Sequence, residues 1–342
     1  MNVYKLLKIF TRIRSKRVKL LGLWSMHTMR RRYIGVFLDP VMACNLQCRM
    51  CYMSDPARKQ PGFSAAPKMD AAELDYVART FFRHAVKLQI GCATEPTLWR
   101  RLPEIVAKGK EMGVPHISIT TNGQLLTTDF LTELLEAGLD EVTLSVHGLD
   151  KPTYEDMMRG ARFERFRALL ADLREAKRSY PHLQVRINYV MNADNTLALE
   201  HLYDVLDGLH VDVLQLRPVQ KLGETSYHNF SLDLIEENYD RLILPIRERC
   251  QREGTLLICP TKENLHEVAT ADDPFVDYVE RLTYYYVSPG GCNKEGFRWL
   301  SDDFAGYHRR QHTGRSLLRS VLRLPASASG RHSSKKLNYK VD

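Results

Sequence analysis

Apolar positions along this chain recur with two different periods from residue 33 onward. Six short segments are continuously apolar or alternate between apolar and polar residues, and both patterns predict β-strands. These segments are residues 33–41, 86–92, 116–121, 141–147, 183–191 and 211–219. The stretches between them repeat apolar residues every three or four positions, which predicts amphipathic helices. Strands that alternate with helices predict a parallel sheet with right-handed crossovers.

Start and stop signals support these helices. Asp70 is followed three residues later by Glu73, a capping box in front of an apolar stripe. Residues 128–137 end at Gly138, where a helix C-cap favours glycine. Further helical patterns fill residues 152–178, as one or two helices, and 193–206. The expected fold class is α/β, a partial (β/α)6 TIM-type barrel whose active site lies at the carboxyl ends of the strands.

Charge is distributed unevenly along the 342 residues. The chain carries a net charge of +8, yet residues 1–32 hold ten Lys or Arg and no acid, and residues 306–342 hold nine with one acid. The 30 basic and 40 acidic residues between them give the middle a net charge of −10. The composition, with 44% hydrophobic and 26% charged residues, excludes wholesale disorder.

The basic N-terminal segment has helical periodicity. Val3, Leu6, Leu7, Phe10 and Ile13 form one stripe with Lys and Arg around it, which predicts a basic amphipathic helix within residues 1–32. Such a helix either rests on an anionic membrane surface, binds nucleic acid, or packs on the body of the protein, and nucleic acid is the less favoured ligand. No apolar run approaches the ~18 residues of a membrane span. We therefore expect a cytoplasmic protein, either free or peripheral on the inner face of the membrane.

Three cysteines, Cys44, Cys48 and Cys51, lie within eight residues directly after the first predicted strand. Thiols at this density bind a metal or cluster, exchange disulfides, or occur by coincidence. A structural zinc site usually needs a second ligand pair, and none follows. A four-iron cluster has four corners, so three thiolates would leave one iron open to another ligand. Seven cysteines without a paired framework also indicate a reducing compartment.

The Cys-x3-Cys-x2-Cys spacing, with Met50 before the last cysteine, resembles the signature of the radical S-adenosylmethionine (radical SAM) superfamily. The resemblance implies that Cys44, Cys48 and Cys51 hold a 4Fe–4S cluster and that the backbone at Met50 contacts the adenine of S-adenosylmethionine. It also implies an external electron donor of the flavodoxin or ferredoxin type. The expected reaction cleaves S-adenosylmethionine reductively to a 5′-deoxyadenosyl radical, which takes hydrogen from a substrate.

Further elements of this resemblance fall at successive strand ends. Glu95 with Pro96 occupies the place of the family's Gly-Gly-Glu-Pro element, although Ala93 and Thr94 replace the glycine pair. Asn122 stands in a Thr-Asn-Gly turn, which is either a plain turn or part of the site.

Five more side chains are candidates for the same site. Ser145 precedes His147, which is either a proton donor or a local substitution for the family's Asp. Arg159 is the candidate for pairing with the cofactor carboxylate, because a guanidinium matches a carboxylate in bidentate geometry. Asn188 and Arg217, on the fifth and sixth strands, face the same cavity if the strand alternation holds. Arg217 would there meet an acidic or phosphate-bearing substrate.

The C-terminal third resembles a cysteine-poor, degenerate SPASM or twitch extension. Cys250, Cys259 and Cys292 offer no close pair, so no auxiliary cluster is expected. The predicted organisation is a basic helix (1–32), a radical SAM core (33–225), a substrate-side extension (226–315) and a basic flexible tail (316–342). The expected substrate is a peptide or a membrane-associated lipid or glycan. The alternative is a non-catalytic iron–sulfur sensor or binding protein with a structural cluster.

Overall fold

The computed structural model describes residues 13–55, 64–221, 225, 227–266 and 274–323. The apolar stripe predicted for the first N-terminal turns (Val3 to Phe10) therefore lies outside the described residues.

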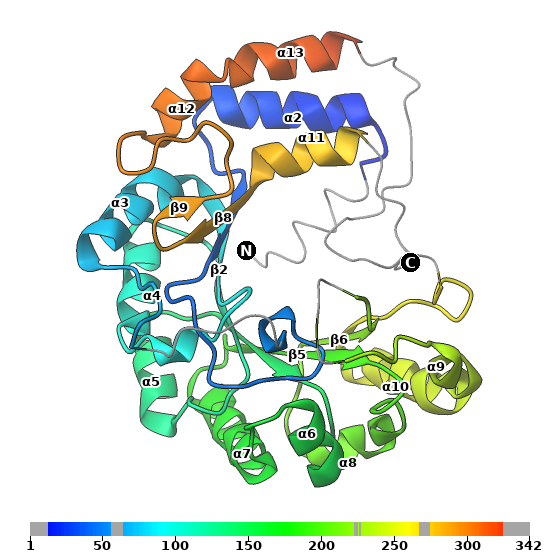
Figure 1. Cartoon of the computed structure of the whole chain (residues 1–342). Helices are drawn as coiled ribbons and strands as arrows, with labels where there is room; N and C mark the ends of the chain where they lie inside the picture. The colour runs from blue at the N-terminus through cyan, green and yellow to red at the C-terminus, as the bar shows by residue number, and fades with distance from the viewer. Residues whose placement is uncertain (1–12, 56–63, 222–224, 226, 267–273, 324–342) are drawn as a thin grey trace.

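One nine-stranded sheet organises the molecule, in the order β7-β6-β5-β4-β3-β2-β1-β8-β9. Neighbouring strands pair in parallel, except that β8 and β9 pair antiparallel. The strands are β1 (Ile34–Leu38), β2 (Ala85–Ile90), β3 (Ile117–Thr121), β4 (Glu141–Val146), β5 (Gln184–Met191), β6 (Val213–Pro218), β7 (Leu256–Ile258), β8 (Tyr284–Ser288) and β9 (Gly291–Cys292). All six predicted core strands are present, and helices surround a sheet that does not close (Figure 1). The predicted partial barrel is confirmed.

The sheet continues beyond β1, a feature that the strand pattern alone does not predict. The residues 284–292 form β8 and β9, and β8 pairs with β1 in the register Gly35↔Tyr284 to Leu38↔Val287. The chain enters β8 from helix α11 (Pro274–Thr283). The C-terminal region thus contributes a strand beside the first strand of the core.

Most helices follow the predicted start and stop signals, but the pattern at 193–206 forms a 3-10 helix (Leu197–His201) followed by only one α-helical turn. The α-helices are α2 (Lys16–Thr28), α3 (Ala71–Phe81), α4 (Leu102–Glu111), α5 (Thr128–Glu136), α6 (Lys151–Met157), α7 (Phe163–Ser179), α8 (Leu202–Val205), α9 (Asp233–Glu237), α10 (Tyr239–Glu253), α11, α12 (Phe304–Arg310) and α13 (Thr313–Arg323). The Asp70 side chain caps α3 by accepting a hydrogen bond from the Glu73 amide (2.8 Å). The long pattern at 152–178 forms two helices, α6 and α7.

The C-terminal end differs from the prediction. A flexible tail was expected from residue 316, but residues up to Arg323 belong to α13, because Leu317 and Val321 of this helix are buried. The prediction is therefore wrong for residues 316–323, while 324–342 lie outside the described part of the chain. No helix among the described residues is long and apolar enough to cross a bilayer.

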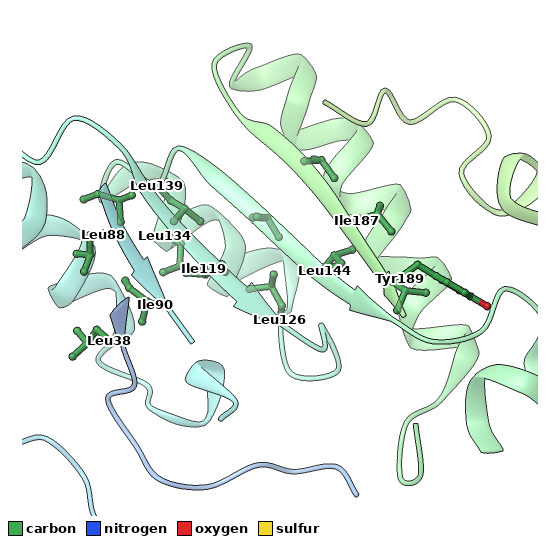
Figure 2. Close-up of a cluster of buried hydrophobic side chains, with 14 of the residues drawn as sticks. Leu38, Leu88, Ile90, Ile119, Leu126, Leu134, Leu139, Leu144, Ile187 and Tyr189 are labelled. Atoms are coloured by element: carbon green, nitrogen blue, oxygen red, sulfur yellow. The ribbon is translucent and has the colours of Figure 1, made fainter. Parts of the chain in front are cut away.

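The main core lies between the sheet and the surrounding helices. Figure 2 shows buried side chains from β2, β3, β4 and β5 meeting those of α5 and the loops around it. Leu88, Ile119, Leu144 and Ile187 come from these strands, and Leu134 comes from α5. Because successive strand residues point to opposite faces, the residues between these apolar positions face the inside of the half barrel. That inner face carries the polar side chains of the candidate site.

Candidate active site

A cavity of about 300 Å³ lies at the carboxyl ends of the strands. This volume is at the lower end of the range of small-molecule sites. Seven of the nine site residues predicted from the sequence line it: Cys44, Cys48, Met50, Cys51, Glu95, Asn122 and Ser145. His147 and Arg217 line the same cavity. The strand ends therefore gather these side chains as the parallel-sheet prediction requires.

The cysteine loop is held by backbone hydrogen bonds to the end of α6. The Gln47 amide donates to the Arg159 carbonyl (2.9 Å), and the Arg49 amide donates to the Met157 carbonyl (3.0 Å). The Arg49 guanidinium also pairs with Asp194 (3.1 Å). Contacts on both sides of Cys48 thus fix the loop against the barrel.

The three thiols suit a cluster that takes one thiolate at each of three irons. Four thiolates around one zinc ion would stand about 3.8 Å apart, because each Zn–S bond is about 2.3 Å. Among the described residues, no three His, Cys, Asp or Glu side chains are placed to hold one ion. An iron–sulfur cluster takes one thiolate at each corner, so its cysteines need not converge. The amides of Leu46 and Met53 donate to the sulfurs of Cys44 and Cys51 (both 3.4 Å), and such bonds stabilise thiolates.

The thiols are protonated at neutral pH when nothing is bound to them. Burial, aided by the charges of Glu95 and Cys51, raises the pKa of Cys44 to about 12. Burial also raises the pKa values of Cys48 and Cys51. Metal ligands must be deprotonated, so loading this loop with a cluster releases protons.

Glu95 is buried and its carboxylate is occupied by donors of the chain itself. Its Oε1 accepts from the hydroxyls of Thr97 (2.5 Å) and Thr121 (2.6 Å), and its Oε2 accepts from the Asn122 amide (2.8 Å). Burial raises the pKa of Glu95, against the lowering effect of these hydrogen bonds. The carboxylate therefore fixes the Thr121–Asn122 turn next to the cysteine loop, whatever else it binds.

Sequence reasoning missed Asp39, which anchors the loop before Glu95. The fully buried Asp39 carboxylate accepts from the amides of Cys92 (2.8 Å) and Ala93 (3.0 Å) and from the Tyr286 hydroxyl (2.7 Å). Tyr286 belongs to β8, so the extra strand reaches the site through this bond. The only signal in the sequence was an acidic residue at the end of an apolar strand.

Gly91 opens the same loop in a conformation that other residues resist. Its φ is +80°, and a Cβ placed there would lie 2.3 Å from the Thr120 carbonyl oxygen. One glycine of the loop is therefore indispensable, although the family's glycine pair is replaced by Ala93 and Thr94.

Asn122 and Met50 are oriented by neighbours on the cavity wall. The Asn122 side-chain amide donates to Asn45 Oδ1 (2.9 Å) and lies 4.0 Å from the Cys44 sulfur. The Met50 sulfur accepts from the Asn192 side-chain amide (2.7 Å). Each residue connects the cysteine loop to a strand end of the barrel.

Arg159 and Asn188 do not line the cavity. The Arg159 side chain is exposed, and its contact with the cysteine loop is made by its carbonyl. Asn188 accepts from the Arg186 guanidinium (2.8 Å) in the polar interior of the barrel. Val190, two residues further along the same face of β5, lines the cavity instead. Strand alternation correctly predicted that Asn188 points into the barrel. Asn188 lies two residues before Val190, which is about 6.6 Å along the strand at about 3.3 Å per residue, so it lies below the cavity.

His147 lines the cavity and has a buried ring nitrogen. Its Nδ1 is buried and has no hydrogen-bond partner among the residues that the structure describes. Burial and the nearby charge of Arg217 lower the pKa of His147 to about 4. The imidazole is therefore neutral at physiological pH, beside an arginine that lines the same cavity.

The C-terminal cysteines do not gather. Cys250 contacts the Tyr203 hydroxyl from α10, and Cys259 follows β7. Cys292 lies in β9, at the opposite edge of the sheet from β7. The resemblance of this region to a SPASM or twitch extension stays a prediction.

Comparison with known proteins places this site in a family. Residues 40–206 match the Radical SAM superfamily. A probable GTP 3′,8-cyclase of Sulfolobus acidocaldarius is 29% identical over 215 residues, covering 61% of this chain and 65% of the relative. That of Saccharolobus solfataricus is 31% identical over 204 residues, covering 58% and 62%. The chain thus spans less than two thirds of the length of these relatives.

Solved structures support the fold. Streptococcus suis SuiB bound to S-adenosylmethionine superposes with a TM-score of 0.58 at 16% identity, over 78% of this chain and 61% of that one. The structure of anSMEcpe with bound AdoMet gives 0.51 at 17% identity, over 66% and 61%. The radical SAM superfamily uses a 4Fe–4S cluster and S-adenosylmethionine, and the cysteine loop and cavity fit both. Residues 40–206, with the family's cysteine motif at the mouth of a partial barrel, form a domain of the radical SAM superfamily.

Proposed function

We propose that this chain is a radical SAM enzyme that abstracts hydrogen from a substrate bound in the 300 Å³ cavity. The observation that carries the proposal is the meeting of Cys44, Cys48 and Cys51 with Glu95 and Ser145 around that one cavity. When bound, the cluster and S-adenosylmethionine supply the one-electron reductive chemistry that makes hydrogen abstraction possible. The chain's share is to hold both reactants close together and to exclude water.

Residues near the cysteine loop would hold the cofactors. Cys44, Cys48 and Cys51 would each bind one iron, while Asn122 keeps the Cys44 side of the loop in place. Ser145 offers a hydroxyl to the ribose or carboxylate of S-adenosylmethionine. Met50 lines the wall proposed for the adenine. The exposure of Arg159 leaves it outside this proposed set.

The other wall of the cavity suits an anionic substrate. Arg217 supplies a positive charge there, and the neutral imidazole of His147 lines the cavity with it. A phosphate or carboxylate is the group that an arginine recognises best. The relatives named GTP 3′,8-cyclase favour a phosphate-bearing small molecule over the peptide expected from the C-terminal outline. A lipid-linked phosphate would satisfy the same side chains.

The proposed partners are an electron donor of the flavodoxin or ferredoxin type and an anionic membrane surface near the basic N-terminal segment. A cytoplasmic position on the inner face of the membrane would bring both together. The excess of Lys and Arg at the two ends of the chain supports the second partner.

Formation of 5′-deoxyadenosine tests the proposed reaction. The anaerobically reconstituted protein is incubated with S-adenosylmethionine and dithionite, alone, with GTP, and with small-molecule and lipid fractions of a cell extract. We expect one phosphate-bearing fraction to stimulate turnover. Arg217→Gln should raise the KM for that fraction more than it lowers kcat, since it removes a binding charge. No 5′-deoxyadenosine under any condition would contradict the proposal and favour the iron–sulfur sensor.

A further inference from the structure

Exposed apolar side chains concentrate on two helices that lie far apart in the sequence. Among the described residues, eight large apolar side chains are strongly exposed, and five of them lie on α2, at its C-cap, or on α13. They are Val18, Leu21, Met29, Leu318 and Leu322. Leu322 is 66% exposed and Val18 is 52% exposed. An isolated exposed leucine is ordinary, but a concentration of this kind marks an interaction site.

These two helices form one layer. Helices α2 and α13 lie side by side (Figure 1). Their inner sides are closed, because Leu20 and Leu23 of α2 and Leu317 and Val321 of α13 are all buried. A hydrogen bond between the Tyr278 and Ser316 hydroxyls (3.2 Å) also joins α13 to α11. Each helix therefore has a packed side and an outer side that faces solvent.

The outer side of α13 combines apolar and basic side chains. Leu318 and Leu322 are four residues apart, as are Arg315 and Arg319, so each pair shares a side of the helix. Residues 315 and 322 differ by seven positions, which places both pairs on neighbouring parts of one surface. All four side chains are exposed. This arrangement is typical of a helix that lies in a membrane interface.

The charge of the layer is of one sign. Neither α2 nor α13 contains an Asp or Glu. The segments of sequence next to them, residues 1–15 and 324–342, add eight Lys or Arg and one acid, whereas the middle of the chain carries a net charge of −10. An anionic bilayer would attract this side of the molecule and repel the acidic body. Each Lys or Arg near such a surface contributes about 1 kcal/mol.

We propose that the outer sides of α2 and α13, which we call the two-helix surface, dock on an anionic phospholipid bilayer. Leu318 and Leu322 enter the interface while Arg315 and Arg319 meet the lipid phosphates. A nucleic acid would use the arginines but leave the exposed leucines in water. The proposal rests on the membrane partner proposed above and assigns it a surface. It concerns binding alone, so it can fail while the reaction proposed at the cysteine loop stands, and the reverse.

Vesicle flotation of the full-length chain tests this proposal. The vesicles contain phosphatidylcholine with about 30% phosphatidylglycerol, or phosphatidylcholine alone, in about 0.1 M salt, where surface charges are only partly screened. We expect flotation with the anionic vesicles alone. The double variants Leu318→Ser/Leu322→Ser and Arg315→Glu/Arg319→Glu should each lower the partition coefficient by more than about tenfold, since losing two arginines removes about 2 kcal/mol of attraction.

Matched controls are available elsewhere on the chain. Leu197 and Leu244 are 44% and 40% exposed but lie outside the two helices, so Leu197→Ser/Leu244→Ser should float like wild type. Circular dichroism should show the same helix content in all variants, because the changed side chains are exposed. Flotation of both α13 variants at the wild-type level would overturn the proposal, and so would equal binding to neutral vesicles. RNA binding by wild type and by the arginine variant is measured alongside. If the arginine variant loses RNA binding but floats like wild type, the membrane proposal is overturned in favour of nucleic acid.

Discussion

At the scale of single residues, the site depends on backbone conformations that only certain residues adopt. Gly91 and Gly290 have nearly equal positive φ angles, +80° and +82°, but different surroundings. A Cβ at Gly91 would collide with the Thr120 carbonyl oxygen at 2.3 Å, whereas a Cβ at Gly290 would meet nothing within 4 Å. Adding a Cβ at Gly290 therefore introduces backbone strain alone, whereas adding one at Gly91 introduces the same strain and a steric clash.

We predict that Gly290→Ala lowers the free energy of unfolding by about 1–2 kcal/mol, the cost of the left-handed conformation alone. Gly91→Ala should lower the free energy of unfolding by about 1–3 kcal/mol more than Gly290→Ala, because its Cβ would also clash with Thr120 and Pro96. Urea unfolding at 25 °C measures both. Equal losses in the two variants would show that the loop before Glu95 is not fixed as described.

The residues of the site differ in how far the sequence could predict them. Cys44, Cys48 and Cys51 were predictable because their spacing is itself a chemical signal. Asp39 was not, because its role depends on Tyr286, which lies 247 positions away in the chain. Asn188 was assigned to the correct face of its strand, but strand alternation does not tell at which level along the barrel a side chain lies.

At the scale of elements, the six core strands were predictable because each is a short apolar or alternating segment between helices. The pairing of β8 with β1 was not, since contacts between distant strands leave no periodicity in either one. Helix α13 was missed for a different reason: its Arg and Ser residues dominate the composition, while its buried side has only two apolar side chains, Leu317 and Val321, with Thr313.

Two leucines of α13 provide a test of its packing. Leu317 is fully buried and Leu322 is 66% exposed on the same helix. We predict that Leu317→Ala lowers the free energy of unfolding by about 2–5 kcal/mol through cavity formation. Leu322→Ala should change it by less than about 0.5 kcal/mol. If Leu317→Ala were as mild as Leu322→Ala in chemical unfolding, residues 316–323 would be the flexible tail that composition suggests.

At the scale of the whole molecule, buried histidines make stability depend on pH. Burial is the largest cause that lowers the pKa of His84 and His147 to about 4 and that of His308 to about 3. In the unfolded chain these groups take up protons near pH 6.5. Between about pH 6.5 and pH 4 the unfolded state therefore binds more protons than the native state, and the free energy of unfolding falls as the pH falls.

We predict that the urea midpoint drops steadily from pH 6.5 to pH 5. Each such histidine contributes up to about 1.4 kcal/mol per pH unit. His308→Phe, which keeps an aromatic ring against Phe304, should make this dependence shallower. The midpoint would be independent of pH over this range if the native histidines titrated normally.

The central claim is that Cys44, Cys48 and Cys51 hold an iron–sulfur cluster. Cys92 supplies a matched control, because it is an exposed thiol that lines the same cavity. Iron and acid-labile sulfide are measured per chain after anaerobic reconstitution of wild type, Cys92→Ala and the triple variant Cys44→Ala/Cys48→Ala/Cys51→Ala. We predict about four irons per chain in wild type and Cys92→Ala, and almost none in the triple variant. Wild-type iron content in the triple variant would contradict the account.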